Sequence, residues 1–307
     1  MYLICGEALF DFFLTTDNGR GSLGFEARAG GSPFNVAIGI ARQEGRAALL
    51  TGVSDDLLGD RLAAMLEREG VDTRYLIRSG RRTTLSLVDL TDAGAPAYSF
   101  YGVGSADCSL DVGDLPVLDD TIQGLHFGSY SIAVEPVASA FFELAARECH
   151  RFISLDPNVR LSVVADPTIW RNRIAALLPF VDLVKVSRED IAELFPDQTP
   201  DAVAHRWLDA GPSIVVVTDG AKSVRAYRPA SMIEVPPSSV DVVDTVGAGD
   251  AFQAALLTCL MHERSDRMDA ATITDAALRV ALEQASEVAA ETCRRRGADI
   301  PFRSATR

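Results

Sequence analysis

Three residues with little or no side chain, Gly247, Ala248 and Gly249, stand directly before an acid in the stretch "DTVGAGDAF". Apolar residues then recur at helical spacing, which predicts an amphipathic helix that begins near Ala248 and buries Phe252, Ala255, Leu256, Cys259 and Leu260. The first amides of a helix have no intrahelical partner, and the helix dipole is positive at that end. Glycines let an anion approach these amides without meeting a Cβ atom. The stretch therefore predicts an anion hole for a phosphate or another oxyanion.

Asp250 is the acid that follows this turn. A carboxylate repels a phosphoryl group, so a loop that served only to bind phosphate would avoid one. The residue makes chemical sense as a general base that orients and deprotonates an attacking hydroxyl group. The alternative is structural: the glycines form a tight turn, and Asp250 is a favourable acid in the first turn of a helix. The turn alone does not decide between these two interpretations.

Two other phosphate-binding motifs are excluded. The chain contains no GxxxxGK[ST] sequence, so it has no P-loop. The run that starts at Gly247 has Phe252 where a dinucleotide-binding fingerprint requires a small residue, and it lies far from the first strand–helix unit.

The segment "DPNVR" places three polar side chains after the probable strand "RFISL". If the chain stays extended, Asp156, Asn158 and Arg160 share one face, because side chains alternate along a strand. Arg160 then offers a guanidinium fork to a phosphate group. The alternative is a turn at the end of a strand with a surface ion pair.

A second strand end carries polar residues in "DLVKVSREDI". Ser187 is a good helix N-cap, and Asp190 stands where it completes a capping box. Lys185 shares a strand face with Ser187 at the edge where ligands gather in open parallel sheets. In "SIVVVTDGAKSVRAY", Asp219-Gly220 predicts a hairpin turn between two strands.

The elements that carry these residues alternate between strand and helix, which predicts strand–helix–strand units and a parallel sheet. Probable strands are "AALLTGV", "GLHFGSY", "RFISLD", "DLVKVS" and "SIVVVT". Residues 83–103 break the alternation and predict an antiparallel hairpin with a turn at Asp92–Pro96. With part of residues 11–24, this hairpin is expected to form a small projecting sheet on a single domain that spans 1–307.

Composition limits the class of partner. The 307 residues are 48% hydrophobic, and 29 Lys and Arg against 43 Asp and Glu leave a net charge of −14 without a long basic run. This disfavours nucleic acid and anionic membranes as partners. The five cysteines are scattered and form no metal-binding spacing. No apolar stretch approaches the roughly 20 residues that span a bilayer, so we expect a cytoplasmic protein.

Two distant motifs together carry a family resemblance. "DTVGAGDAF" resembles the C-terminal signature of the ribokinase-like (PfkB) carbohydrate kinases, and "AGGSPFNVA", about 210 residues earlier, resembles their N-terminal signature. The segments "GEALFDFF", "SFYGVGSADCSL", "DPNVR" and "DLVKVSREDI" are most similar to bacterial fructokinases. The resemblance implies a three-layer α/β sandwich with a mainly parallel sheet and a small β-sheet lid. It also implies transfer of the γ-phosphoryl group of ATP to fructose, with Mg²⁺ and, in part of the family, K⁺.

The resemblance also implies roles for single residues. The sugar pocket would use Asp11, Gly30, Gly31 and Asn35, with Phe100 and Tyr101 closing over it and Arg160 on the sugar or the γ-phosphate. The nucleotide would contact Lys185, Ser187, Thr218, Gly220, Gly247 and Gly249. Glu189 would face Mg²⁺ through water, although the departure of "SRED" from the usual "NxxE" leaves Glu189 and Asp190 as alternatives. A monovalent cation would lie near Asp244, Val246 and Gly297.

Other functions stay open at this point. A kinase of the same fold for 2-keto-3-deoxygluconate, ribose or a nucleoside would share these motifs. A sugar sensor without activity belongs to a different class, and the presence of Asp250 argues against it because a sensor needs no base. Apolar residues on the projecting hairpin further predict a homodimer that pairs through this sheet.

Overall fold

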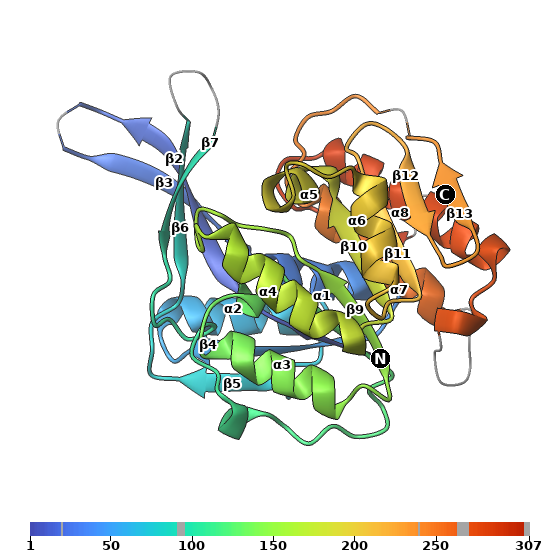
Figure 1. Ribbon diagram of the computed structural model, residues 1–307. Coiled ribbons are helices and arrows are strands. Elements are labelled where there is room, and N and C mark those ends of the chain that lie inside the picture. Colours follow the sequence, from blue (N-terminus) through green and yellow to red (C-terminus); the bar gives the residue numbers. More distant parts are fainter. Residues whose placement is uncertain (20, 91–95, 239, 263–269, 304–307) are drawn as a thin grey trace.

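The structure is a computed structural model that describes residues 1–19, 21–90, 96–238, 240–262 and 270–303 (Figure 1). In this part of the chain the larger sheet has nine strands in the order β13-β12-β11-β10-β9-β8-β1-β4-β5. Neighbours from β11 to β5 are parallel, whereas β12 and β13 are antiparallel additions at one edge. The strands are β1 (Tyr2–Cys5), β4 (Ala47–Ser54), β5 (Leu76–Ser79), β8 (Gly124–Gly128), β9 (Phe152–Asp156), β10 (Leu183–Ser187), β11 (Ile214–Thr218), β12 (Val224–Tyr227) and β13 (Met232–Val235).

Helices cover both faces of this sheet because its central strands, such as β1, β4, β8 and β9, are buried on both sides. In β1, Leu3 and Cys5 pack into one hydrophobic core, and Tyr2 and Ile4 pack into the other. The first core includes α3 (Val137–Arg147), α4 (Pro167–Leu177), α5 (Arg188–Leu194) and α6 (Pro200–Leu208). The second includes α1 (Ser32–Arg42), α2 (Leu57–Arg68), α7 (Ala248–His262) and α8 (Asp275–Cys293). The predicted three-layer sandwich with a mainly parallel sheet is confirmed.

A second sheet of four strands projects from the body, as Figure 1 shows. Its order is β3 (Leu23–Gly30), β2 (Leu9–Asp17), β6 (Leu85–Leu90) and β7 (Pro96–Tyr101). The pairs β2–β3 and β6–β7 are antiparallel, and β2–β6 is parallel. The sheet contains strands from both predicted segments and is larger than predicted, because β3 continues to Gly30. Most of the predicted turn at Asp92–Pro96 lies outside the described residues.

Helix α7 begins at Ala248, as the sequence predicts. Its predicted face is buried, with Cys259 partly buried. The prediction of an amphipathic helix is wrong, however, because Ala251, Ala254 and Leu257 on its other sides are buried as well. The cause is its position: α7 packs between α1 and α8 inside the helical layer. The Gly247–Gly249 turn, which we call the anion turn, is therefore attached to a helix in the core of the protein.

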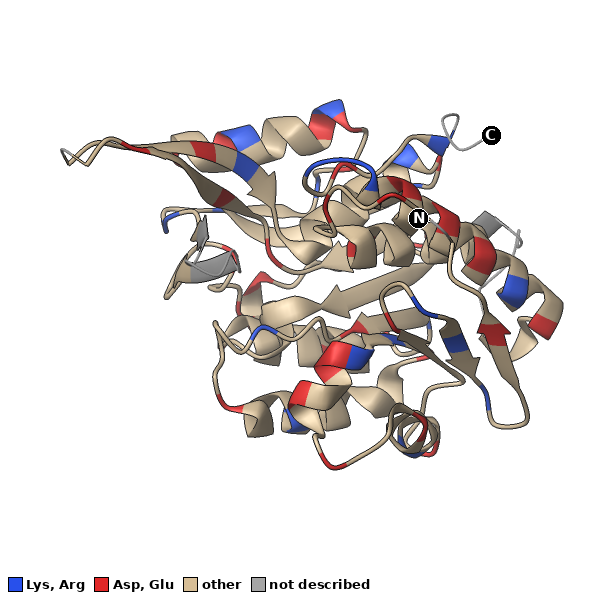
Figure 2. Cartoon of the chain, turned by 90° about the horizontal axis from the view of Figure 1, so that it is seen from above, with Lys and Arg blue, Asp and Glu red and all other residues tan. Residues whose placement is uncertain are grey.

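The surface charge agrees with the composition. Figure 2 shows acidic residues on most of the helices, with basic residues interspersed among them. Within the described ranges, no helix has both the length and the apolar character needed to cross a membrane.

Candidate active site

The main cavity, of about 610 Å³, lies between the projecting sheet and the body. It is lined by residues of the sheet, of the start of α1, of the loop after β9 and of the turn before α7. Its polar lining groups include Glu7, Asp11, Ser32, Asn35, Ser86, Asn158, Arg160, Glu193, Thr245 and Asp250.

Asp250 lies in the first turn of α7 and is only 8% exposed. The Ser32 hydroxyl donates a hydrogen bond to its Oδ1 at 2.7 Å, and the Asn35 amide donates one to its Oδ2 at 2.8 Å. Burial raises the pKa of Asp250, and these hydrogen bonds oppose the rise because they stabilise the carboxylate. Each oxygen keeps a further lone pair for a hydroxyl group in the cavity. Asp250 is thus a fixed acceptor that faces ligand space.

The turn before Asp250 brings backbone close to the cavity, which Gly247 and Gly249 both line. Gly247 has a φ of 79°, and a Cβ atom there would lie 2.4 Å from the Cβ of Ala298. At Gly249 a Cβ atom would lie 3.2 Å from the Nζ of Lys185. The glycine turn, the first turn of α7 and Asp250 therefore meet at one end of the cavity, as the sequence predicts. Ala248 belongs to this turn without lining the cavity.

The residues expected to bind sugar are partly brought together. Asp11, Gly31, Asn35, Phe100 and Arg160 line the main cavity. Phe100 also packs edge-on against Tyr130, with ring centroids 5.0 Å apart.

Two residues that were also expected to bind sugar, Gly30 and Tyr101, do not line the main cavity. Gly30 lies beside Asp11, where a Cβ atom would come within 2.7 Å of Oδ2. Tyr101 is 61% exposed and does not line the cavity, because side chains alternate along β7 and Phe100 takes the inner face.

The residues expected to bind the nucleotide lie along the ends of β10 and β11. Ser187 and Thr218 are register partners on these neighbouring strands. Gly220 follows with a φ of 51° and open space where a Cβ atom would lie, and the hairpin from β11 to β12 forms as predicted. Lys185 differs from this group. It is 4% exposed, and its Nζ donates to Asp156 Oδ2 at 2.8 Å, so it lies under the anion turn.

The prediction that Asp156, Asn158 and Arg160 share an extended face is wrong. Strand β9 ends at Asp156, and Asn158 has a φ of 39°, so the alternation of an extended chain does not continue. Asp156 points into the protein and pairs with Lys185, while Asn158 and Arg160 line the cavity. Arg160 is exposed and its guanidinium donates to the Val159 carbonyl at 2.9 Å.

Glu189 and Asp190, the two candidates for a residue that faces Mg²⁺, lie in different surroundings. Asp190 is buried and forms the predicted capping box with Ser187, and its Oδ1 also accepts from the Val159 amide at 2.9 Å. Glu189 is exposed. Among the described residues no three His, Cys, Asp or Glu side chains cluster as a metal site. Mg²⁺ in kinases needs only one or two carboxylates besides phosphates and water, so Glu189 fits such a role.

The three residues expected near a monovalent cation do lie together. The Asp244 carboxylate accepts from the Val246 amide at 3.0 Å and from the Gly297 amide at 2.8 Å.

Two further residues of the site, Glu7 and Ser32, were not predicted from the sequence. Glu7 is 1% exposed, lines the main cavity and accepts a hydrogen bond from Ser131. Burial raises its pKa to about 7, although hydrogen bonds from Ser131 and Ser129 oppose the rise. An acid at the break of an apolar run, "ICGEALF", was the signal for Glu7. Ser32 lay inside the quoted motif "AGGSPFNVA".

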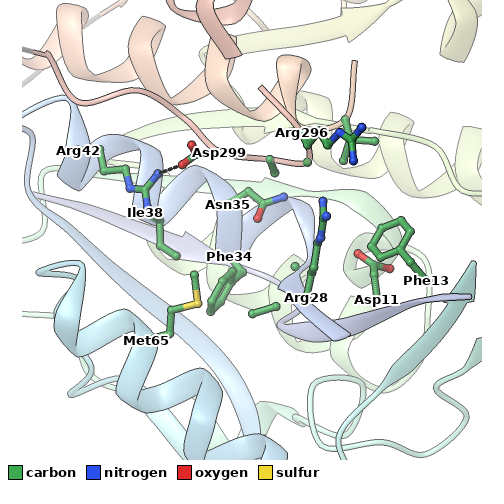
Figure 3. Close-up of a pocket in the computed structure, with 15 residues that line it drawn as sticks. Asp11, Phe13, Arg28, Phe34, Asn35, Ile38, Arg42, Met65, Arg296 and Asp299 are labelled. Carbon is green, nitrogen blue, oxygen red and sulfur yellow. Dashed lines mark hydrogen bonds and ion pairs between the residues drawn. The ribbon is translucent and has the colours of Figure 1, made fainter. Parts of the chain in front are cut away.

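A second cavity of about 310 Å³ lies beside the main one and shares Asp11, Asn35 and Val246 with it. Figure 3 shows Arg28 from the projecting sheet and Arg296 from the C-terminal segment on one side of it. Its other wall contains Phe34, Ile38 and Met65, beyond which Arg42 pairs with Asp299 at 2.7 Å.

Three comparisons with known proteins agree. The family model described as pfkB family carbohydrate kinase matches residues 2–305. A fructokinase of Rhizobium leguminosarum bv. trifolii is 37% identical over 281 residues, which are 91% of this chain and 86% of the relative. The crystal structure of a fructokinase with bound ATP from Xylella fastidiosa has a TM-score of 0.87 and 27% identity, over 99% of this chain and 96% of that one. A fructokinase double mutant from Vibrio cholerae O395, in a form with fructose, ADP and potassium ion bound, has a TM-score of 0.85 and 28% identity over the same shares.

Proposed function

Because this chain belongs to the pfkB family of carbohydrate kinases, we propose that it transfers the γ-phosphoryl group of ATP to fructose and forms fructose 6-phosphate. The observation that carries the proposal is the buried Asp250 carboxylate, held by Ser32 and Asn35 beside the Gly247–Gly249 turn and open to a sugar-sized cavity.

The reaction follows from this arrangement. The primary hydroxyl oxygen of the sugar attacks the γ-phosphorus and forms a new O–P bond. The bond from phosphorus to the β,γ-bridging oxygen breaks, and its electron pair leaves with ADP. Asp250 accepts the hydroxyl proton. The amides of the Gly247–Gly249 turn, which leads into α7, stabilise the negative charge on the transferring group.

Sugar recognition depends on fixed acceptors at the lid side of the cavity. The Asp11 carboxyl, which Ser86 contacts, and the Asn35 side chain offer hydrogen bonds to sugar hydroxyls. A buried acceptor left without a partner disfavours a sugar with the wrong configuration. Phe100 packs over the same space, and Arg160 faces the sugar or the γ-phosphate.

The nucleotide and ions are assigned by the same proposal. Ser187, Thr218 and Gly220 bind the nucleotide at the ends of β10 and β11. Mg²⁺, when bound, neutralises phosphate charge and is held by the phosphates, water and Glu189. A K⁺ ion lies near Asp244, Val246 and Gly297; the potassium ion named for the Vibrio cholerae enzyme supports this assignment. A cytoplasmic location stays our prediction.

The projecting sheet is assigned two roles. It closes over the sugar, and it pairs with the same sheet of a second subunit. The second role is supported by apolar side chains that the body does not cover: Leu23 is 53% exposed, Phe25 is 39% exposed and Tyr101 is 61% exposed.

The Asp250→Asn variant tests the proposed function. It keeps the shape of the side chain and removes the base, so kcat should fall by roughly 10²–10⁴-fold. A coupled assay of ADP release measures this with fructose, 2-keto-3-deoxygluconate, ribose, glucose and adenosine, which also identifies the preferred acceptor.

Asp275→Asn is the matched control, since Asp275 is an exposed acid in the first turn of α8. It should leave kcat unchanged. Retention of more than about a tenth of kcat by Asp250→Asn would show that Asp250 is only a first-turn acid.

A further inference from the structure

Lys185 occupies an unusual place for a lysine. Its side chain is 5% exposed, and its Nζ lies 2.8 Å from Asp156 Oδ2, where the carboxylate is 1% exposed. The same Nζ lies 3.2 Å from the point where a Cβ atom on Gly249 would be. Neither Lys185 nor Asp156 lines the main cavity, so the ammonium group approaches the anion turn from inside the protein.

Fold stability does not explain this ion pair. Two charges lose their hydration when they are buried, and apolar residues of similar volume often stabilise a protein as well or better. The pair is also incompletely satisfied, because the buried Asp156 Oδ1 has no hydrogen-bond partner in the described parts of the chain. A buried polar group without a hydrogen-bond partner requires an explanation. Here the group belongs to an ion pair whose Lys185 lies beside the Gly247–Gly249 turn.

The titratable groups around Lys185 determine its protonation state, and its charge in turn affects theirs. Asp156 on β9, Asp190 on α5 and Asp250 on α7 all raise the pKa of Lys185 against the effect of burial, so it stays an ammonium ion. His126 on β8 is held neutral, because burial and the Lys185 charge lower its pKa to about 3. The Lys185 charge in turn opposes the rise in the pKa of Asp250 that burial causes, and this effect outweighs the smaller, opposite effect of the Asp156 charge.

We propose that Lys185 is a positioning residue of the kinase reaction, whose buried ammonium supplies positive charge to the Gly247–Gly249 turn from beneath. It has two effects: it strengthens the attraction of the turn for the phosphoryl group, and it keeps Asp250 ionised and ready to accept a proton. Asp156 holds the ammonium in place. This inference rests on the proposed function, and it gives Lys185 a role that needs no direct contact with the nucleotide.

The test removes both charges together, because loss of one partner leaves the other charge buried and unpaired. The Lys185→Met/Asp156→Asn variant should fold, as judged by circular dichroism and thermal unfolding. Its kcat should fall by roughly 10-fold or more, and the acid limb of kcat against pH should move to higher pH. Lys185→Arg keeps the charge and should keep the position of the acid limb.

A matched control removes a largely buried ion pair away from the cavity. Arg151 Nε lies 2.8 Å from Glu148 Oε2. Arg151→Met/Glu148→Gln should change thermal stability and leave the acid limb where it is. The Lys185→Gln/Asp156→Asn variant, whose amides can bond to each other, repeats the measurement if methionine disturbs the packing.

The outcomes separate this inference from the proposed function. If the wild-type chain phosphorylates no sugar, the proposed function is wrong. If the wild type is active, and a folded double variant without the two charges keeps the wild-type kcat and the wild-type acid limb of kcat against pH, then Lys185 has only a structural role. If neither neutral pair folds, the ion pair is a requirement of the fold, and the inference is overturned as well.

Discussion

The main cavity holds two buried carboxyl groups, Glu7 and Asp250, with different partners. Asp250 is stabilised as an anion by Ser32, Asn35 and the charge of Lys185. Glu7 has hydroxyl partners, and burial raises its pKa from 4.5 to about 7. Near neutral pH Glu7 therefore takes up and loses a proton at the wall of the main cavity.

The stability of the Glu7→Gln variant relative to the wild type should depend on pH. Below pH 4.5 the side chain is protonated in the folded and unfolded chains, so it contributes no difference. As the pH rises from 4.5 through 7, the unfolded chain ionises first and the wild type loses stability. Glutamine stays neutral, so the Tm of Glu7→Gln should rise by several degrees relative to the wild type over this range.

Differential scanning calorimetry at a series of pH values measures this difference. Glu67→Gln, at an exposed position of α2, serves as the control and should show a constant difference. A constant difference for Glu7→Gln as well would mean that its carboxyl is not held neutral by burial.

Residue types and spacing predicted the glycine turn with Asp250 beside it, and the family resemblance predicted part of the cavity lining, such as Asp11, Asn35 and Phe100. They were not enough to predict what holds the base. Ser32 and Asp250 are separated by 218 positions, and Ser131 and Glu7 by 124. Such contacts depend on how α1 meets α7 and how β1 meets β8, and no local pattern encodes that distance.

At the scale of elements, the projecting sheet is attached to the body by a buried polar cluster. The Asp107 carboxylate accepts hydrogen bonds from Thr84 at 2.5 Å, Ser105 at 2.7 Å and Tyr130 at 2.6 Å. Thr84 directly precedes β6, and Ser105 lies shortly after β7. This cluster fixes both ends of the β6–β7 hairpin beside the cavity.

Thr84→Val removes one donor to this carboxylate with little change in shape. A buried acceptor that loses its partner lowers stability by about 1–3 kcal/mol. The free energy of unfolding in urea should fall by this amount, and the KM for the sugar should rise because the hairpin is less firmly placed.

Thr292→Val is the control, because Thr292 is equally buried and its hydroxyl donates to the Val288 carbonyl within α8. It should change KM little. An unchanged KM for Thr84→Val would show that the cluster stabilises the fold without positioning the hairpin.

Local patterns predicted the hairpins and the start of α7, whereas they misjudged what surrounds α7 and how the chain leaves β9. Helical spacing describes one apolar face, but small residues such as Ala251 and Ala254 fit a buried environment on the other sides too. The left-handed conformation of Asn158 is a tertiary outcome that a strand pattern cannot show.

For the molecule as a whole, the regular alternation of strands and helices predicted the parallel sheet, and the family resemblance predicted the three layers. The alternation did not predict the order of strands, in which β1 lies between β8 and β4. The order of the strands depends on the side of the sheet toward which each strand–helix–strand connection adds the next strand. The alternation of strands and helices along the chain is the same for either side.

The proposed homodimer is the prediction at this scale. Leu23 and Phe25 share one face of β3, so a charged residue there should prevent pairing. Sedimentation at micromolar concentration should give twice the chain mass of 32.9 kDa for the wild type and a monomer for Leu23→Lys/Phe25→Lys.

Val280→Lys, at an exposed position of α8 outside this sheet, should remain a dimer. A wild-type monomer, with or without sugar, would contradict the pairing and leave the sheet only the role of a lid.

The position of α7 has a consequence for how such enzymes diverge. Asp250, the proposed base, is carried by a helix enclosed between α1 and α8, while Asp11 and Phe100 are carried by a sheet that projects from the body. Mutations that alter the chemistry must therefore survive selection for core packing, whereas mutations on the projecting sheet largely escape it. A lineage with this architecture can exchange one acceptor sugar for another through many viable intermediates while the phosphoryl transfer step is inherited unchanged.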